Sequence, residues 1–192
     1  MADTTVAIRE ARAADANGIA RVHVQSWRST YPGLIPDAFL VNLSEPAAAA
    51  RWRAVAETRG PGQGAFVAVD LAGTIGPAGG IVGIASYGAR RVAVDGYGGE
   101  FYALYLLDEA KGLGIGRRLM AAMADRFLAA DIRSAAVWCL RDNPSRWFYE
   151  RLGGTRIAER PIRFAGSQLV EIAYGWRDLV PLARLSAGPE VR

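Results

Sequence analysis

A glycine-rich segment at 111–118 is the most chemically informative stretch of the sequence. It reads Lys-Gly-Leu-Gly-Ile-Gly-Arg-Arg and stands between a strand-like pattern and the start of a helical one. Glycines at such a junction let backbone N–H groups approach an anion closely, and the unpaired N–H groups at a helix N-terminus stabilise phosphate oxygens. The segment therefore predicts a phosphate-binding loop. The alternative is a glycine-rich turn that only packs a strand against a helix.

Two widespread phosphate loops do not match this segment. A Walker A loop ends in Gly-Lys-Ser or Gly-Lys-Thr, and a Rossmann fingerprint reads Gly-x-Gly-x-x-Gly near the first strand of its domain. The spacing here is Gly-x-Gly-x-Gly, and it occurs late in the chain, after the pattern of an antiparallel hairpin. Binding of a nucleotide such as ATP or NAD by this loop is therefore a secondary hypothesis.

Hydrophobic periodicity indicates the elements that must position the loop. Short apolar or alternating patterns, typical of strands, occur at 6–9, 65–71, 81–87, 100–107, 134–140, 155–163 and 167–176. Patterns typical of helices occur around 19–31, 46–59, 115–130 and 144–152, while 34–43 is a loop or a short helix. We therefore expect one mixed α/β domain over 1–176, with 177–192 packed on it or frayed.

The composition fits a globular domain that needs neither disulfides nor metal. The chain has 192 residues, of which 51% are hydrophobic and 22% charged, and a chain of this size can bury a sizeable core. Cys139 is the only cysteine and His23 the only histidine. This excludes a disulfide framework and a zinc site built from several cysteines or histidines. We therefore expect no metal and a cytoplasmic location.

Charge and hydropathy argue against nucleic-acid and membrane partners. The positive charges are 22 arginines and a single lysine, Lys111, against 19 acidic residues, for a net charge of +4. The arginines are scattered and form no basic stripe, so we expect no nucleic-acid partner. The uncharged stretch 71–89 contains six glycines and Pro77, which favours two strands around a turn over a membrane span. No signal peptide is visible at the N-terminus.

Two motifs, in this order and spacing, resemble the signatures of the GCN5-related N-acetyltransferase (GNAT) family. The family's pyrophosphate motif reads Gln/Arg-x-x-Gly-x-Gly/Ala. The segment Lys111 to Gly116 is similar, with lysine in the first position. The segment 143–154, Asn-Pro-Ser-Arg-Trp-Phe-Tyr-Glu-Arg-Leu-Gly-Gly, resembles the second signature. The resemblance covers 4–176. It implies the GNAT fold: a twisted, mostly antiparallel sheet of about seven strands flanked by about four helices, with strands four and five splayed.

The resemblance also implies acetyl-CoA as the co-substrate, held in the cleft between strands four and five. Strand four would grip the pantetheine arm, Asn143 would contact the same arm, and the glycine loop would bind the pyrophosphate. The Leu104 N–H would polarise the thioester carbonyl as negative charge develops on its oxygen. The residues implied in acetyl-CoA binding are Leu104, Tyr105, Leu106, Lys111, Gly112, Leu113, Gly114, Ile115, Gly116, Arg117 and Asn143.

Two residues are implied in proton transfer. Tyr149 matches the family's usual general acid, which protonates the departing thiolate. Glu100, eleven residues before Lys111, lies where histone-type members place a general base, and it would deprotonate the amine directly or through water. The alternatives are an exposed strand-end carboxylate for Glu100 and a core tyrosine for Tyr149. The preceding Phe148 is expected in the core.

The acceptor pocket is implied around the end of the first helix. Trp27 and Tyr31 are suited to pack on an organic amine, and aromatic anchoring of a helix end explains them equally well. Tyr102 on strand four is expected to point into the same pocket. His23 shares a helix face with apolar residues, which favours packing over a base role. Cys139 is expected to be a buried small hydrophobe and not a nucleophile.

Together these features predict an enzyme that transfers an acetyl group from acetyl-CoA directly to a primary amine of a small molecule. A protein or peptide N-acetyltransferase of the same fold is one alternative, and a non-catalytic acyl-CoA-binding module is another. Because the GNAT family includes monomers and dimers, a homodimer is an open expectation. The sequence does not specify the acceptor amine.

Overall fold

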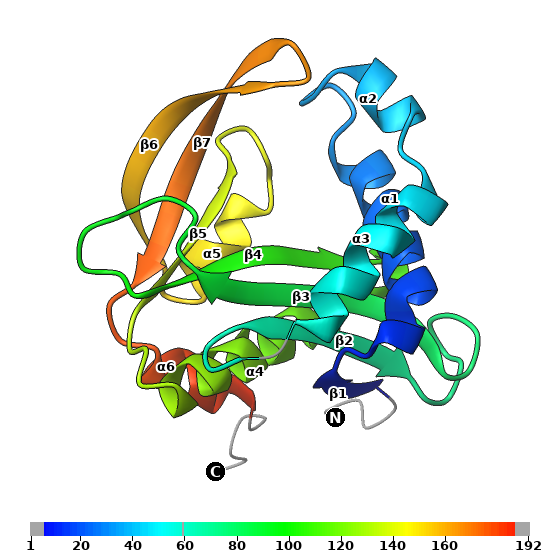
Figure 1. Cartoon of the computed structure of the whole chain (residues 1–192), viewed down its shortest axis with the longest axis horizontal. Coiled ribbons are helices and arrows are strands. Elements are labelled where there is room, and N and C mark those ends of the chain that lie inside the picture. The colour runs from blue at the N-terminus through cyan, green and yellow to red at the C-terminus, as the bar shows by residue number, and fades with distance from the viewer. Residues whose placement is uncertain (1–5, 59, 187–192) are drawn as a thin grey trace.

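The computed structural model describes residues 6–58 and 60–186, which form one twisted sheet with helices on both faces (Figure 1). The strands are β1 (Val6–Glu10), β2 (Gly64–Asp70), β3 (Gly80–Ala89), β4 (Gly99–Leu106), β5 (Ala135–Leu140), β6 (Thr155–Phe164) and β7 (Ser167–Trp176). The α-helices are α1 (Ala16–Thr30), α2 (Asp37–Val41), α3 (Glu45–Glu57), α4 (Ile115–Ala129), α5 (Arg146–Arg151) and α6 (Val180–Ala183). Short 3₁₀ turns cover Ala13–Asp15, Asp108–Ala110 and Arg184–Ser186.

The strand order is β1-β2-β3-β4-β5-β7-β6, and every neighbouring pair is antiparallel except β4 and β5. This parallel pair is short, because only Gly99, Glu100 and Phe101 pair with Ala135, Ala136 and Val137. Beyond these rungs the two strands diverge, as Figure 1 shows. A mostly antiparallel sheet of seven strands with the fourth and fifth splayed confirms the fold expected from the sequence.

A bulge in β4 accompanies the divergence. Phe101 pairs with Tyr87 of β3, whereas Ala103 pairs with Ser86, so Tyr102 has no partner on β3. An extra residue of this kind bends a strand and increases its local twist. The bulge therefore lies at the rung where β4 leaves β5, and the half of β4 beyond it does not pair with β5.

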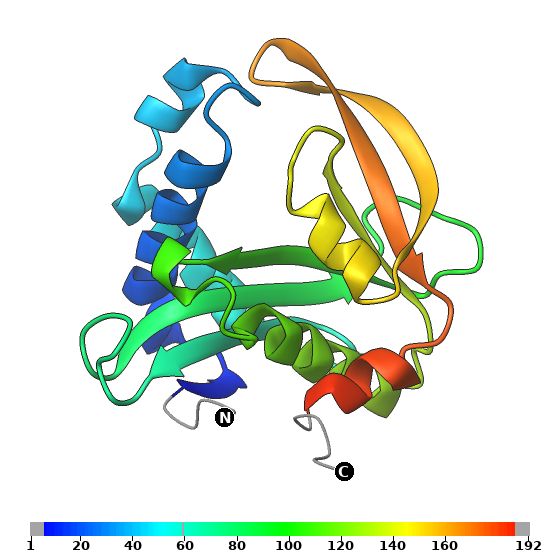
Figure 2. The same ribbon diagram turned by 180° about the vertical axis from the view of Figure 1, so that it is seen from behind.

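Two layers of apolar side chains hold helices on opposite faces of the sheet. Helices α1 and α3 cover one face and α4 covers the other, as the two opposite views show (Figure 2). On α4, Leu119, Met120, Met123 and Phe127 are fully buried; their spacing is the helical period that the sequence displays. On α1, Ile19 is fully buried toward the other face. Burial of these two stripes fixes both helices relative to β4.

The segment after β7 continues over the α4 side of the molecule. Helix α6 contacts α4, and Leu179 and Leu182 are buried there. Residues 187–192 of the expected C-terminal tail lie outside the described residues. In the described ranges, 6–58 and 60–186, the helices are all too short or too polar to cross a membrane.

Candidate active site

A cleft of about 370 Å³ lies where β4 and β5 separate. The splayed halves of both strands line it, together with the loop before α4, the turn before α5 and the end of α1. The lining includes the following residues singled out from the sequence: Tyr31, Tyr102, Leu104, Tyr105, Leu106, Lys111, Gly112, Gly114, Gly116, Arg117, Asn143 and Tyr149. The fold thus brings residues from five separate segments to one cleft.

The glycine loop adopts backbone angles that only glycine takes easily. Gly112 has φ +77° and Gly114 has φ +75°, both in the left-handed region. Gly114 is the N-cap of α4, so the first N–H groups of that helix have no acceptor within it, and Gly114 and Gly116 line the cleft. Leu113 is exposed and Ile115 is buried in the core; neither side chain lines the cleft. This geometry fits an anion at the start of α4.

Positive charge gathers on the lining of the same cleft. Lys111, Arg117 and Arg151 all line it, and Lys111 also pairs with Asp108 at 2.5 Å. The buried Nε of Arg117 has no hydrogen-bond partner in the described part of the chain. A buried donor without a partner is costly, so this nitrogen is suited to an acceptor oxygen of a bound anion.

The edge of β4 on the β5 side does not pair with β5 beyond Phe101. Leu104, Tyr105 and Leu106 line the cleft along this edge, and β5 pairs with β4 only as far as Phe101. Because successive backbone groups of a strand alternate direction, this edge offers N–H and C=O groups in turn. It can therefore pair with amide groups of an extended ligand.

Tyr149 projects from α5 into the cleft from a buried position. Its side chain is 6% exposed, and its ring packs beside Tyr174 and Trp176, with centroids 6.3 Å from each. Burial raises the pKa of the Tyr149 phenol well above its usual value. The hydroxyl makes no hydrogen bond within residues 6–58 and 60–186. It is therefore a protonated donor that faces the cleft.

Asn143 connects the turn before α5 to the end of α1. Its Oδ1 accepts a 2.8 Å hydrogen bond from the Ser145 N–H, and its Nδ2 donates to the Tyr31 hydroxyl at 3.3 Å. Burial raises the pKa of Tyr31, so this phenol is protonated. The side chain of Asn143 is thus held in a fixed orientation beside the cleft.

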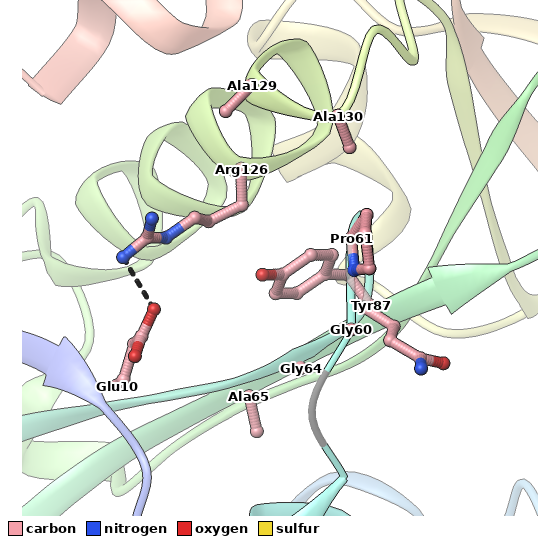
Figure 3. A pocket seen from close by; sticks show the side chains of 11 residues that line it. Glu10, Gly60, Pro61, Gly64, Ala65, Tyr87, Arg126, Ala129 and Ala130 are labelled. Atoms are coloured by element: carbon pink, nitrogen blue, oxygen red, sulfur yellow. Dashed lines mark ion pairs between the residues drawn. The ribbon is translucent and has the colours of Figure 1, made fainter.

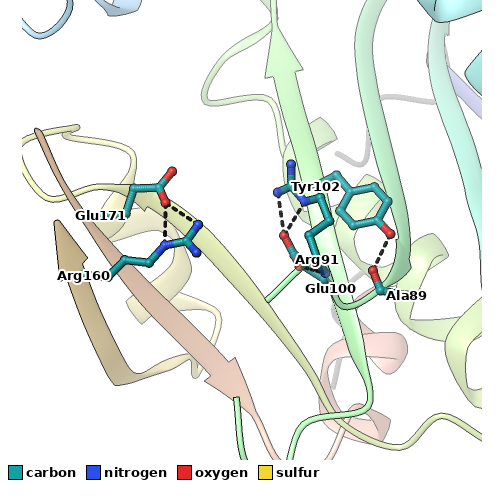
Figure 4. A network of polar contacts seen from close by, with 6 residues as sticks. All are labelled: Ala89, Arg91, Glu100, Tyr102, Arg160 and Glu171. Atoms are coloured by element: carbon teal, nitrogen blue, oxygen red, sulfur yellow. Dashed lines mark hydrogen bonds and ion pairs between the residues drawn. The ribbon is translucent and has the colours of Figure 1, made fainter. Parts of the chain in front are cut away.

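Glu100 lies outside the lining of the cleft and is bound by Arg91. Its carboxylate is 2% exposed; Oε1 accepts hydrogen bonds from Arg91 Nε at 2.8 Å and Nη2 at 2.5 Å, and Oε2 accepts the Arg91 backbone N–H at 2.7 Å (Figure 4). The fold therefore does not bring Glu100 and Tyr149 together as cleft residues. The base role of Glu100 stays a prediction.

An aromatic cluster forms the α1 wall. Trp27 lies behind the cleft lining and packs on Tyr31 and Tyr105, with centroid distances of 4.7 and 6.2 Å. His23 stacks on Tyr105 at 5.1 Å, and its Nδ1 accepts a 2.9 Å hydrogen bond from the Trp52 indole N–H. Burial lowers the pKa of His23 to about 4. This histidine is neutral at pH 7, and its lone pair is occupied.

Two residues that sequence reasoning placed in the core also line the cleft. Phe148 packs against the core and also lines the cleft. Cys139 is half-buried on β5 in the same lining, and burial raises the pKa of its thiol to about 12. Val137 and Trp138 also line the cleft, and no sequence motif singles them out. The parallel register of β4 and β5 is the signal that identifies the β5 residues.

A second cavity, of about 200 Å³, contains none of the predicted site residues (Figure 3). It lies beside Tyr87, between the loop 60–64 and the end of α4. Arg126 pairs with Glu10 at 2.5 Å on one side of it. The chemistry predicted from the sequence therefore concentrates in the larger cleft.

Comparison with known proteins places this geometry in a family. A model of the FR47-like protein family matches residues 80–162. The chain is 38% identical over 180 residues to the uncharacterized N-acetyltransferase YuaI of Bacillus subtilis (strain 168). This alignment covers 94% of the chain and 98% of YuaI.

Solved structures share the fold at lower sequence identity. One is yncA of Salmonella typhimurium, an acetyltransferase solved with its cofactor acetyl-CoA; it has a TM-score of 0.63, 20% identity, and coverage of 92% of this chain and 95% of yncA. Another is a GNAT phosphinothricin acetyltransferase from Sinorhizobium meliloti in complex with acetyl-CoA, with a TM-score of 0.62, 24% identity, and coverage of 90% and 88%. The near-complete match to YuaI, together with the splayed β4–β5 cleft and the glycine loop, shows that the chain is an N-acetyltransferase of the GNAT family.

Proposed function

We propose that this enzyme transfers an acetyl group from acetyl-CoA directly to the primary amine of a small molecule. The observation that carries the proposal is the arrangement of a single cleft. The glycine loop with its basic residues, the free edge of β4 and the protonated Tyr149 all line it. Acetyl-CoA carries a matching set of groups: pyrophosphate, amide-bearing arm and thioester.

The pyrophosphate end is supported by charge. Lys111, Arg117 and Arg151 line this end, and the N-terminus of α4 adds backbone donors. The pantetheine amides would pair with the free edge of β4. A backbone N–H of that edge, for which Leu104 is our candidate, would stabilise the oxyanion of the thioester carbonyl.

Transfer forms one bond and breaks another at the thioester carbonyl carbon. The amine nitrogen attacks this carbon, the new C–N bond forms, the C–S bond breaks, and Tyr149 donates its proton to the sulfur. Burial raises the pKa of Cys139 in the same cleft to about 12. Burial in the same cleft would likewise raise the pKa of the departing thiol, so a protonated donor such as Tyr149 would assist its release.

Glu100 remains our candidate to take the proton of the amine. Because Arg91 occupies both of its oxygens, this role requires Arg91 to release one of them. Glu100→Gln would lower kcat/KM by about 10²- to 10⁴-fold if the carboxylate is the base. A fall in kcat/KM of less than threefold would show that solvent, and not Glu100, takes the proton of the amine.

The walls of the acceptor side support a small acceptor. Phe164, at the tip of the β6–β7 hairpin, packs on Phe39 of α2 with ring centroids 4.7 Å apart. This contact joins two elements that lie side by side at the same end of the molecule in both views (Figures 1 and 2). A peptide chain needs an open groove, and this contact closes one end of it.

The function is tested by release of the CoA thiol from acetyl-CoA across amino acids, polyamines, aminoglycosides and peptides. We expect turnover with at least one small amine and none with the peptides. If acetyl-CoA binds but no acceptor in the panel gives turnover, the result would support a non-catalytic binding module instead. A thermal shift with ATP or NAD but not with acetyl-CoA would contradict acetyl-CoA binding itself.

Two neighbouring arginines offer a matched control for the pyrophosphate end. Arg117 faces the cleft, whereas Arg118 Nη2 donates to the Val6 carbonyl at 2.8 Å. Arg117→Gln is expected to raise the Kd of acetyl-CoA about 10-fold, which corresponds to about 1.4 kcal/mol. Arg118→Gln is expected to leave the Kd unchanged. Equal effects of both changes would contradict the assignment.

A further inference from the structure

Two matching arginine–aromatic–glutamate groups flank the point where β4 and β5 separate. Phe101 and Val137 form the last rung of the parallel pair. The next residues along the two strands are Tyr102 and Trp138, and both line the cleft where the strands part.

Each of these rings supports a guanidinium. Arg91 lies over the Tyr102 ring at 4.7 Å from Cζ to the centroid, and Arg160 lies over the Trp138 ring at 4.3 Å. A carboxylate holds each guanidinium in turn: Glu100 binds Arg91, and Glu171 accepts Arg160 Nε at 3.1 Å and Nη2 at 2.8 Å (Figure 4). The stack and the paired hydrogen bonds fix both planar groups before any ligand arrives.

Each guanidinium has a donor nitrogen that its glutamate partner does not use. The Nη1 of Arg91 and the Nη1 of Arg160 make no hydrogen bond within the described residues, while Nε and Nη2 are used. The two side chains are 59% and 35% exposed. Although each guanidinium is already paired with a glutamate, its free Nη1 can donate a hydrogen bond to a further carboxylate.

The charged residues that line the cleft argue against a polycationic acceptor. Aspartate and glutamate are absent from the described residues that line it, whereas lysine and arginine are present. The two nearby glutamates, Glu100 and Glu171, are paired with Arg91 and Arg160. A polycationic acceptor would therefore find no free carboxylate at the cleft.

We propose that the acceptor is a small amino acid, whose carboxylate is bound by the free Nη1 of Arg91, with Arg160 of β6 as the second donor. Neither arginine lines the cleft itself, but each lies over a ring that does. The carboxylate would fix the orientation of the molecule between the Tyr102 and Trp138 rings and direct its amine toward the thioester. This inference names the acceptor class of the site under the proposed function and rests on it.

The direct test compares each of the twenty L-amino acids with its own carboxamide as acceptor. Members of a pair share the side chain and the amine but differ in the acidic group, and kcat/KM is expressed per concentration of neutral amine. We expect about a 10- to 100-fold preference for the acid in the pair that reacts best, the range for one charge-assisted hydrogen bond.

Arginine variants test which side chain causes the preference for the acid over the amide. Arg91→Gln is expected to reduce the acid-to-amide ratio to about 3 or less, without changing the Kd of acetyl-CoA. Arg160→Gln is expected to lower the same ratio by a smaller factor; its partner Glu171 is partly exposed, so this variant remains informative if Arg91→Gln does not fold. Matched controls are Arg90→Gln and Arg163→Gln, since both side chains are exposed and lie outside the pair and the cleft. Both controls should retain the wild-type ratio.

The outcomes separate this inference from the proposed function. Equal turnover of acids and amides, or turnover of amines such as spermidine with none of the acids, overturns the amino-acid acceptor and leaves acetyl transfer intact. An unchanged ratio in Arg91→Gln overturns the role of Arg91. Absence of turnover with every amine, despite binding of acetyl-CoA, overturns the proposed function together with this inference.

Discussion

Replacement of Tyr149 by phenylalanine removes one oxygen atom and tests the proposed acid. The hydroxyl is inside the cleft and has no hydrogen-bond partner in the described part of the chain, so its loss leaves no polar group without a partner. We therefore expect the free energy of unfolding to change by no more than about 1 kcal/mol. Because the ring stays in place, the Kd of acetyl-CoA should also remain within about threefold.

The catalytic effect of Tyr149→Phe should be far larger. General-acid catalysis contributes about 10²- to 10⁴-fold, so kcat should fall by that factor, equivalent to about 3–5 kcal/mol in the barrier. Since burial raises the pKa of Tyr149 well above its usual value, the wild-type phenol stays protonated. The wild-type kcat should therefore show no decline up to about pH 9.5 that depends on this residue.

The assay is release of the CoA thiol under saturating acetyl-CoA, with calorimetry for the Kd and urea unfolding for stability. Tyr174→Phe is the matched control, because its hydroxyl donates to Glu150 Oε1 at 2.6 Å and lies outside the cleft lining. This change should cost about 1.5–3 kcal/mol of stability and leave kcat unchanged. A kcat within threefold of wild type for Tyr149→Phe, or equal losses in both variants, would refute the acid assignment.

Three further predictions follow from the pKa values and the backbone. Burial lowers the pKa of His23 to about 4, so between about pH 6.5 and 4 the unfolded chain binds more protons, and the free energy of unfolding should fall by up to about 3 kcal/mol as the pH drops through this range. His23→Gln, whose amide oxygen can still accept the Trp52 N–H, should lose this part of the pH dependence in urea unfolding; an unchanged slope would count against it. Burial raises the pKa of the Cys139 thiol to about 12, so alkylation by iodoacetamide at pH 8, followed by mass spectrometry, should be about 10³-fold slower in the folded chain than in urea, and comparable rates would show that the thiol is not protected. Gly114→Ala, at φ +75°, should lose about 1–2 kcal/mol of stability and weaken acetyl-CoA binding, whereas Gly153→Ala, at φ +82°, should lose similar stability alone; equal affinities would contradict a role for Gly114 in the loop.

Much of the fold could be predicted from local pattern. The strands and the longer helices begin and end within a few residues of the expected positions, because alternation and helical period directly reflect which face of each element is buried. Backbone requirements were also visible, since Gly112 and Gly114 take left-handed angles that other residues avoid. The short helix α6 was not expected, because its four residues are too few to display a period.

The cleft was only partly predictable. Lys111 could be selected because it precedes a glycine-rich loop, and Asn143 and Tyr149 because they lie in a segment that resembles a GNAT signature. Trp138 and Cys139 could not, because an apolar strand pattern does not reveal which strand runs beside it or where the pair separates. The partner of Glu100 was equally hidden, since Arg91 lies in an irregular connection with no period to orient it.

The sequence by itself determined the order of the elements and the resemblance to the GNAT family, and it predicted that the glycine loop binds phosphate. These depend on residue types at short spacing, which the chain displays directly. Only the tertiary structure decided which of the charged groups are free. Glu100 and Glu171 are occupied by Arg91 and Arg160, and His23 is neutral because it is buried against Trp52. Pairing and desolvation depend on neighbours far away in the sequence, so they arise only when the sheet brings those neighbours together.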